Sequence, residues 1–541
     1  MREKILQKDY TKLGTVLQLH LPMDIEFSIP KDNPVWLVHD GVERMDLSKL
    51  YGTYAHLESN EVTPRQMLKL VVFAAMHGVR SSRAIEDFCQ NRIDCRLLLD
   101  EKKAPDYSTI ARFRSLHLAA CAKDVLVEMD RYLGYHGELS ADTLFIDGTK
   151  IESFANKYKF VWKKGVTKRL GKMMEEIPAF FLETETSFGI CIRHGNELHK
   201  RHLKRLYRKL MKLKKESNTV FVHGAGKRKT PLQKAVEQLQ GYISRLKDYE
   251  TKLHICGDRN SYAKTDHDAT FMRMKEDAML NGQLKPGYNI QFAVDAEYVV
   301  WTDESPWPTD VKTLIPFLED MRSHLGTNYR KIVADAGYES EENYEYLKKN
   351  DMTSYIKPKT YECEKKRSFK NAIGNRENMT YDRATDSYIC ANGKRVECQG
   401  TKKGKSRNGY VTEKTVYACH DCAGCPYKKD CIRGNNSKLP LEQREKHFEV
   451  SKRFLELRAE DKERIASEEG KMLRMNRSIQ SEGAFADVKE TQLFRRFLGT
   501  GHLNALTETV ICVLAHNFNK LHHKIQNGTQ GRYLFPLKKL A

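Results

Sequence analysis

Two aspartates, each directly after a short apolar run, are the residues in this sequence best suited to bind a metal ion. Residues 144–146 (Leu-Phe-Ile) precede Asp147, and residues 331–334 (Lys-Ile-Val-Ala) precede Asp335. Apolar runs of this length predict buried strands, and a polar turn after each would present the acid at the edge of a sheet. If the strands are neighbours, the two carboxylates converge. With a third acid they could hold two divalent cations about 3.5–4 Å apart, which indicates phosphodiester chemistry.

The segments between these acids predict an α/β fold with a mixed sheet. Residues 288–294 and 299–301 alternate as strands, 311–321 show one apolar helical face, and 354–356 form another short strand after Asp335. The order strand, strand, strand, helix, strand, helix, strand is typical of a mixed sheet with helices on its faces. In that order the first and fourth strands each end in aspartate.

A later helix supplies a third acid. Glu482, Phe485 and Lys489 are predicted to lie on adjacent turns of one helical face, so an acid and a base point at one cleft. The last helix, over 506–521, has an apolar stripe and is expected to pack on the sheet.

The charge balance predicts a polyanionic partner. The chain has 541 residues, with 92 Lys and Arg against 72 Asp and Glu, a formal charge of +20. Such an excess favours nucleic acid, although a basic soluble protein without such a partner is the alternative. Near the first acid, a phosphate path could be lined by Lys150, Lys157, Lys159, Lys163 and Lys164.

The N-terminal third predicts short helices joined by tight turns. Thr63-Pro64 begins one helix, Ser81 begins a second, and Asp106 caps a third that carries Arg112 and Arg114. Short, arginine-rich helices of this kind resemble a helix-turn-helix DNA-binding module. An ordinary helical bundle is the alternative.

A strongly basic helix is predicted over 200–216. Leucines form a heptad-like stripe along it, lysines and arginines cover the rest, and a second helix over 232–253 could return antiparallel. Three functions are open for this pair: a hairpin that grips DNA, a solvated arm, or a coil that forms dimers.

Thirteen cysteines, an odd number, argue against a disulfide framework and for reduced thiols. Between 363 and 441 their spacing suits a tetrahedral, structural zinc site, with reduced structural cysteines or an iron–sulfur cluster as alternatives. The preferred ligands are Cys419, Cys422, Cys425 and Cys431; Cys390 or Cys398 could replace one of them.

These motifs together resemble the DDE transposases of bacterial insertion sequences, in particular the group built around insertion sequence eleven-eighty-two. The resemblance extends from about Thr63 to about Leu521. It departs in one respect: Arg477 stands five residues before Glu482, and the tyrosine that the family places before this arginine is absent. The matching segments are 144–150 with Asn156, 286–291, 335–338, the cysteine cluster and 477–489.

The resemblance implies an RNase H-like catalytic domain in three parts with two insertions. Under it the domains are an N-terminal helical, helix-turn-helix-like DNA-binding domain at 1–135; catalytic parts at 136–160, 286–360 and 441–541; a basic helical insertion at 161–285; and a cysteine-rich, zinc-ribbon-like insertion at 361–440.

The resemblance also implies a mechanism. Asp147, Asp335 and Glu482 would form an acidic triad that holds two Mg²⁺ or Mn²⁺ ions, used to cleave DNA at the element's ends and to join them to target DNA. Arg477 would contact an end phosphate, and Lys489 with Arg495 would hold backbone phosphates. The expected partners are double-stranded DNA and, in the DNA complex, a second copy of the chain.

Two other functions stay open at this point: a domesticated DNA-binding protein that no longer cuts, and a structure-specific nuclease of the same fold. The sequence lacks an apolar run long enough to span a bilayer, and its first residues lack the apolar core of a signal peptide. We therefore expect a cytoplasmic, nucleoid-associated protein.

Overall fold

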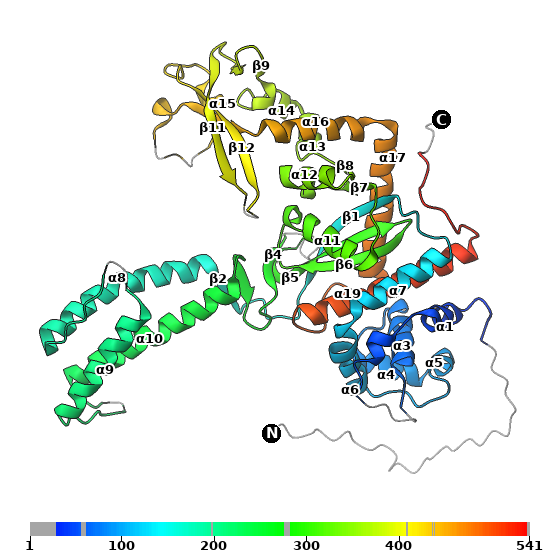
Figure 1. Ribbon diagram of the computed structural model, residues 1–541, viewed down its shortest axis with the longest axis horizontal. Coiled ribbons are helices and arrows are strands. Elements are labelled where there is room, and N and C mark those ends of the chain that lie inside the picture. The colour runs from blue at the N-terminus through cyan, green and yellow to red at the C-terminus, as the bar shows by residue number, and fades with distance from the viewer. Residues whose placement is uncertain are drawn as a thin grey trace.

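A six-stranded mixed sheet lies at the centre of the molecule (Figure 1). The computed structural model describes residues 29–537 except 56–60, 196–197, 225, 275–281, 407–408, 435–436 and 438. Residues 1–28 of the predicted N-terminal domain therefore lie outside the described residues. The strands are β1 (Thr143–Glu152), β4 (Thr270–Arg273), β5 (Leu284–Asp295), β6 (Tyr298–Ser305), β7 (Lys331–Ala334) and β8 (Thr353–Ile356).

The sheet order shows that the first and fourth predicted strands are neighbours. The order is β6-β5-β1-β7-β8, and β4 pairs with the first residues of β5 on the edge that β6 also uses. β5 is antiparallel to β1, whereas β7 and β8 run parallel to β1. Helices α11 (Leu314–Leu325) and α12 (Glu341–Lys349) connect β6, β7 and β8. The prediction of a mixed α/β sheet flanked by helices is therefore confirmed.

One expectation about β1 is wrong. The strand does not stop at Asp147 but continues to Glu152. Its pairing with β7 ends at Ile146, while its pairing with the longer strand β5 continues along the whole stretch. After Ile146, β1 is hydrogen-bonded to β5 but no longer to β7. Asp147 therefore lies where the parallel pairing ends.

The N-terminal region is helical, as predicted. Thr63 and Gln66 form a capping box at the start of α3, and the side chains of Ser81 and Asp106 cap α4 and α6. The third predicted helix is shorter than expected, because α6 gives way to a π-helical turn at Phe113–His117. The helices are α1 (Val35–Arg44), α2 (Ser48–Tyr51), α3 (Pro64–Met76), α4 (Ser82–Gln90), α5 (Ile93–Leu98), α6 (Tyr107–Arg112) and α7 (Ala122–Tyr135).

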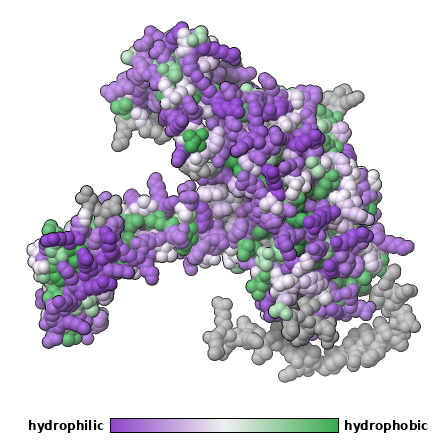
Figure 2. Space-filling model, viewed as in Figure 1, coloured by the Kyte–Doolittle hydropathy of each residue, from purple (hydrophilic) through white to green (hydrophobic). Residues whose placement is uncertain are grey.

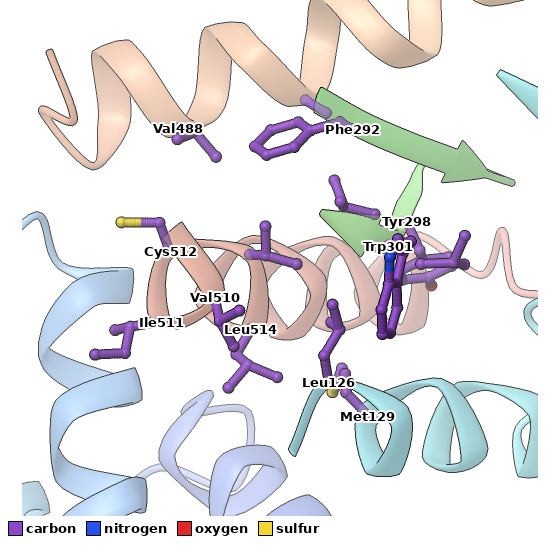
Figure 3. Packing of buried hydrophobic residues seen from close by; sticks show 14 of the residues in the cluster. Leu126, Met129, Phe292, Tyr298, Trp301, Val488, Val510, Ile511, Cys512 and Leu514 are labelled. Carbon is purple, nitrogen blue, oxygen red and sulfur yellow. The ribbon is translucent and has the colours of Figure 1, made fainter. Parts of the chain in front are cut away.

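Helix α19 (His502–Gln526) joins this region to the sheet. In Figure 3, Phe292 and Val488 lie on one side of it, and Leu126 and Met129 of α7 lie on the other. These side chains belong to one continuous buried cluster. The predicted packing of the last helix on the sheet is confirmed, and the same helix also holds the N-terminal helices in place.

A helical arm extends away from the sheet between β1 and β5 (Figure 1). We use this name for residues 163–256. The arm has its own buried cluster, which includes Phe180, Leu206 and Leu239, and a short two-stranded sheet closes its base. Its helices are α8 (Lys163–Phe188), α9 (Lys200–Glu216) and α10 (Pro231–Cys256), and the sheet at its base pairs β2 (Phe160–Trp162) with β3 (Ser261–Ala263).

The cysteine-rich segment forms a separate antiparallel sheet, at the top of Figure 1. Helices α16 (Lys452–Ala466) and α17 (Glu468–Arg477) lead from it back to the central sheet. Of the described helices, none is long and apolar enough to cross a membrane. The elements of this segment are α13 (Tyr361–Glu364), α14 (Arg367–Lys370), β9 (Thr380–Asp382), β10 (Ser387–Ile389), β11 (Arg395–Lys405), β12 (Val411–Cys419), α15 (Lys428–Cys431) and β13 (Lys446–Val450).

Candidate active site

Asp147 and Asp335 lie side by side where the parallel ladder of β1 and β7 ends. The last paired residues of that ladder are Ile146 and Ala334, and each aspartate is the next residue of its own segment. Paired strands lie about 4.8 Å apart, so the two aspartates start from adjacent backbone positions. The structure thus brings together two acids that are far apart in the sequence.

Local hydrogen bonds orient both carboxylates. Asp147 Oδ1 accepts from the backbone N–H of Gly148 at 2.8 Å, and Asp335 Oδ1 accepts from that of Gly337 at 2.7 Å. Both side chains are partly buried. Each carboxylate is therefore held in position by a backbone N–H one or two residues further along the chain.

The helical segment that carries Glu482 is not a regular α-helix. After α17, residues Ser478–Glu482 are π-helical, α18 covers Gly483–Ala486, and Asp487–Thr491 are π-helical again. Phe485 fixes this segment on the sheet, since its ring stacks on that of Phe292 in β5 with the centroids 4.5 Å apart. Helical irregularities of this kind are frequent at functional sites.

Arg477 links two of the predicted catalytic acids. Its Nη1 donates to Asp147 Oδ2 at 2.7 Å, and its Nη2 donates to Glu482 Oε1 at 3.2 Å. In an α-helix, residues five apart point about 140° away from each other, whereas a π-helical turn brings them to one face. The π-helical turn between them thus explains how Arg477 reaches Glu482.

The guanidinium of Arg477 supplies positive charge next to Asp147 and Glu482. No three His, Cys, Asp or Glu side chains within the described ranges are arranged so that they could hold a metal ion. The Arg477 guanidinium lies between Asp147 and Glu482 instead. Carboxylates are the ligands that Mg²⁺ prefers, so the residue types fit a divalent cation that replaces the guanidinium.

A fourth carboxylate, that of Asp310, lies close to the glycines that follow Asp147 and Asp335. A Cβ atom added to Gly148 would lie 2.8 Å from Asp310 Oδ1, and one added to Gly337 would lie 2.9 Å from Asp310 Oδ2. Asp310 is not among the site residues predicted from the sequence, because it follows Pro308 and Thr309 in a pattern that suggests a helix cap. The signal in the sequence that could have indicated Asp310 is the pair Gly148 and Gly337, because each glycine leaves room for its carboxylate.

Buried polar side chains hold Asp310. Asn289 Nδ2 donates to its Oδ1 at 2.7 Å, and Gln291 Nε2 donates to the same oxygen at 3.2 Å. The hydroxyl of Tyr338 donates to Gln291 Oε1. Burial, with Asp310, Asp147 and Asp335 nearby, raises the pKa of Tyr338 well above its usual value, so the hydroxyl stays protonated and donates.

A cleft lies next to Gly148. Lys150, Lys489 and Arg495, three residues predicted to contact DNA, contribute to its walls together with Asp310. Lys285 also lines it and pairs with Glu152 at 2.8 Å. The cleft therefore combines several cations with a carboxylate beside the acids, which suits a phosphodiester backbone.

The two N-terminal arginines differ in exposure. Arg112 is exposed on α6, as a DNA contact requires. Arg114 is not suited to that role, because it lies 3.7 Å from Glu508 and its Nη1 donates to the carbonyl of Arg80. Burial lowers the pKa of Arg114. The structure assigns Arg114 to the contact between the N-terminal helices and α19.

Five cysteines surround one small cavity in the cysteine-rich segment. Sγ of Cys422 accepts from the backbone N–H of Lys446 at 3.4 Å, a contact that also favours thiolate ligands. Cys398 is exposed and does not line the cavity, whereas Cys390 does. The lining cysteines are Cys390, Cys419, Cys422, Cys425 and Cys431. None of the thirteen cysteines is joined in a disulfide in the structure.

Comparison with known proteins matches two parts of the chain. A family model described as "Transposase DDE domain" covers residues 389–522, which include Arg477, Glu482 and Lys489. A second, described as "Transposase domain (DUF772)", covers residues 23–116. No curated protein and no solved structure matches the chain. The two family matches indicate a transposase of the DDE type and suggest DNA transposition in general.

Proposed function

We propose that this protein is a transposase that binds the ends of its insertion sequence and catalyses metal-dependent DNA cleavage and strand transfer. The observation that carries the proposal is that β1 and β7 place Asp147 beside Asp335, and that Arg477 pairs with both Asp147 and Glu482. The sheet order, with one antiparallel strand beside β1, also supports an RNase H-like catalytic domain with the arm and the cysteine-rich segment as insertions.

The three acids would bind two divalent cations, Mg²⁺ or Mn²⁺, which supply Lewis-acid stabilisation of the reacting phosphate. Asp310 lies close enough to the glycines after both aspartates to add negative charge there. Arg477 neutralises the acids before cations bind. Once released, its guanidinium is free to contact an end phosphate bidentately.

The cleft beside the acids would bind the DNA backbone. Lys150, Lys489 and Arg495 line it and would position phosphates without reading the base sequence. Arg112 on α6 would add a contact from the N-terminal helices. Duplex DNA is thus the proposed partner, and a second copy of the chain would bind the second end.

The cysteine cluster would hold a structural zinc ion. Four thiolates leave no open position for substrate, so the proposed role is to fold the cysteine-rich sheet. Cys390 and the four cysteines of the preferred set all line the cavity, which gives one more thiol than tetrahedral zinc needs. Within the DDE transposases, we assign the protein to the group of insertion sequence eleven-eighty-two, because its segments 144–150, 286–291, 335–338 and 477–489 and its cysteine cluster resemble that group.

The test uses DNA that carries both flanks of the reading frame, purified protein, and Mg²⁺. We expect Asp147→Asn, Asp335→Asn and Glu482→Gln each to reduce cleavage by more than about a hundredfold, because even outer partners of metal ligands contribute about ten- to a hundredfold. Duplex binding should stay within about twofold of the unchanged protein. Glu468→Gln is the matched control, an exposed acid at the start of the same helical segment whose partner is Lys471.

Three outcomes decide between the proposed function and its alternatives. A product in which element ends are joined to target DNA supports a transposase. Cleavage without joining indicates a nuclease, and binding without cleavage by the unchanged protein indicates a silent DNA-binding protein. Cleavage retained in any of the three variants removes that residue from the proposed triad.

A further inference from the structure

The helical arm carries most of the net positive charge of the chain. Residues 163–256 contain 22 Lys and Arg against 9 Asp and Glu, which is +13 of the formal +20. The excess is greatest on α9, where nine of seventeen residues are Lys or Arg and Glu216 is the one acid. In Figure 2 the outer part of the arm is mainly hydrophilic.

The apolar face of α9 is already used inside the arm. Leu203, Leu206 and Leu210 are buried in the cluster that α9 forms with α8 and α10. This arrangement argues against the dimer-forming coil, because the leucine stripe is not available to a second chain. It also argues against insertion into a bilayer, which needs an exposed apolar face.

The opposite face of α9 carries a row of exposed cations. We call this set the α9 basic row, and its spacing of three to four residues keeps all of its members on one side of the helix. At 1.5 Å per residue the row is about 16 Å long. Its members are Arg201, Lys204, Arg205, Arg208 and Lys212, all of them exposed.

Among the described residues, most of the α9 basic row has no carboxylate partner. Within the described part of the chain, Lys212 pairs with Glu216 at 3.5 Å, and the other four members form no ion pair. Other lysines of the arm do have partners: Lys200 pairs with Glu250, Lys229 with Glu237 and Lys252 with Asp248. Like charges one turn apart repel each other and weaken the helix, so an uncompensated row is best explained by an anionic partner.

We propose that the α9 basic row is a second binding surface for duplex DNA, which contacts the phosphate backbone away from the catalytic cleft. The inference rests on the proposed function, which supplies DNA as the polyanion. Duplex DNA carries one negative charge per about 1.7 Å of axis, so a straight row about 16 Å long faces several phosphates. Contacts of this type add affinity and fix orientation without base specificity.

The test measures binding of the full chain to a 60-base-pair duplex of arbitrary sequence by fluorescence anisotropy over a series of KCl concentrations. The variant neutralises three members of the row, Lys204→Gln, Arg205→Gln and Arg208→Gln. Each lost phosphate contact makes the slope of log K against log[salt] shallower by about 0.9, so we expect a change of about 2.7.

A matched control removes the same three charges from paired positions of the arm, Lys200→Gln, Lys229→Gln and Lys252→Gln. We expect its slope to change by less than about 1, because these cations already have carboxylate partners. Circular dichroism of both variants checks that the arm stays helical. Equal slopes in the two variants would overturn the inference, since only total charge would then matter.

Two further outcomes separate this inference from the proposed function. A chain that binds no duplex at all contradicts the proposed function. A chain that binds and cleaves element DNA but whose row variant keeps the original slope contradicts the inference alone. The inference is also overturned if the row variant changes the salt slope with a duplex RNA of equal length but not with DNA. That result would assign the α9 basic row to RNA.

Discussion

Replacing Arg477 by glutamine removes the cation that lies between Asp147 and Glu482. The side chains of Arg477 and Asp147 are 17% and 16% exposed, and that of Glu482 is 61% exposed. The contact with Asp147 is therefore the stronger of the two, since exposed ion pairs contribute little. Without the guanidinium, the acids face one another with less compensation and should bind an added cation more readily.

The size of the effect follows from the contact that a cation must displace. A hydrogen bond to a charged, largely buried group contributes about 1.5–3 kcal/mol. At about 1.4 kcal/mol per factor of ten, its removal should tighten binding of Mn²⁺ to the DNA-free protein by about ten- to a hundredfold. DNA cleavage should fall in the same variant, because the proposed phosphate contact of Arg477 is lost with it.

The assay is a titration of Mn²⁺ followed by electron paramagnetic resonance, in which free Mn²⁺ is measured directly. Arg477→Lys is the control: it keeps the positive charge, so its affinity for Mn²⁺ should stay close to that of the unchanged protein. Weaker or unaltered Mn²⁺ binding in a folded Arg477→Gln protein would refute the idea that this guanidinium occupies the position of a cation.

The remaining predictions concern the supports of the site and the cysteine cluster. Phe485→Ala should destabilise the protein by about 3–5 kcal/mol in urea unfolding, because a buried, stacked ring is lost. Asp310→Asn should weaken Mn²⁺ binding by about tenfold in the same titration and leave duplex binding unchanged. Cys422→Ser should lose bound zinc in a colorimetric assay, and Cys398→Ser should keep it. Burial raises the pKa of Cys419 to about 11, so zinc must displace a thiol proton and its affinity should fall as pH is lowered.

The sequence was sufficient where local patterns and pairing agree. Apolar runs before Asp147 and Asp335 predicted two strands of a mixed sheet. Their adjacency, which the sequence left as a condition, is found in the pairing of β1 with β7. The leucine stripe at 200–216 predicted α9 with the bounds that the structure has. In each case a residue's neighbours in sequence determine most of its surroundings.

The sequence was insufficient where several elements meet. Arg114 looks like an exposed arginine on a short helix, but α19, almost four hundred residues later, covers it and supplies Glu508. Asp310 gains its place from β1, β5 and the turn after β7 together. No spacing within a single element predicts such contacts, because they depend on how separate elements pack.

The position of Arg477 is the clearest case of a local irregularity with a functional consequence. With α-helical geometry throughout, a separation of five residues would direct Arg477 and Glu482 to different faces, and only one of them could face Asp147. The π-helical turn Ser478–Glu482 brings both to the same face, and the stacking of Phe485 on Phe292 keeps that face against β5. The separation of five residues between Arg477 and Glu482 is thus compatible with one site, because a π-helical turn holds about one residue more than an α-helical turn.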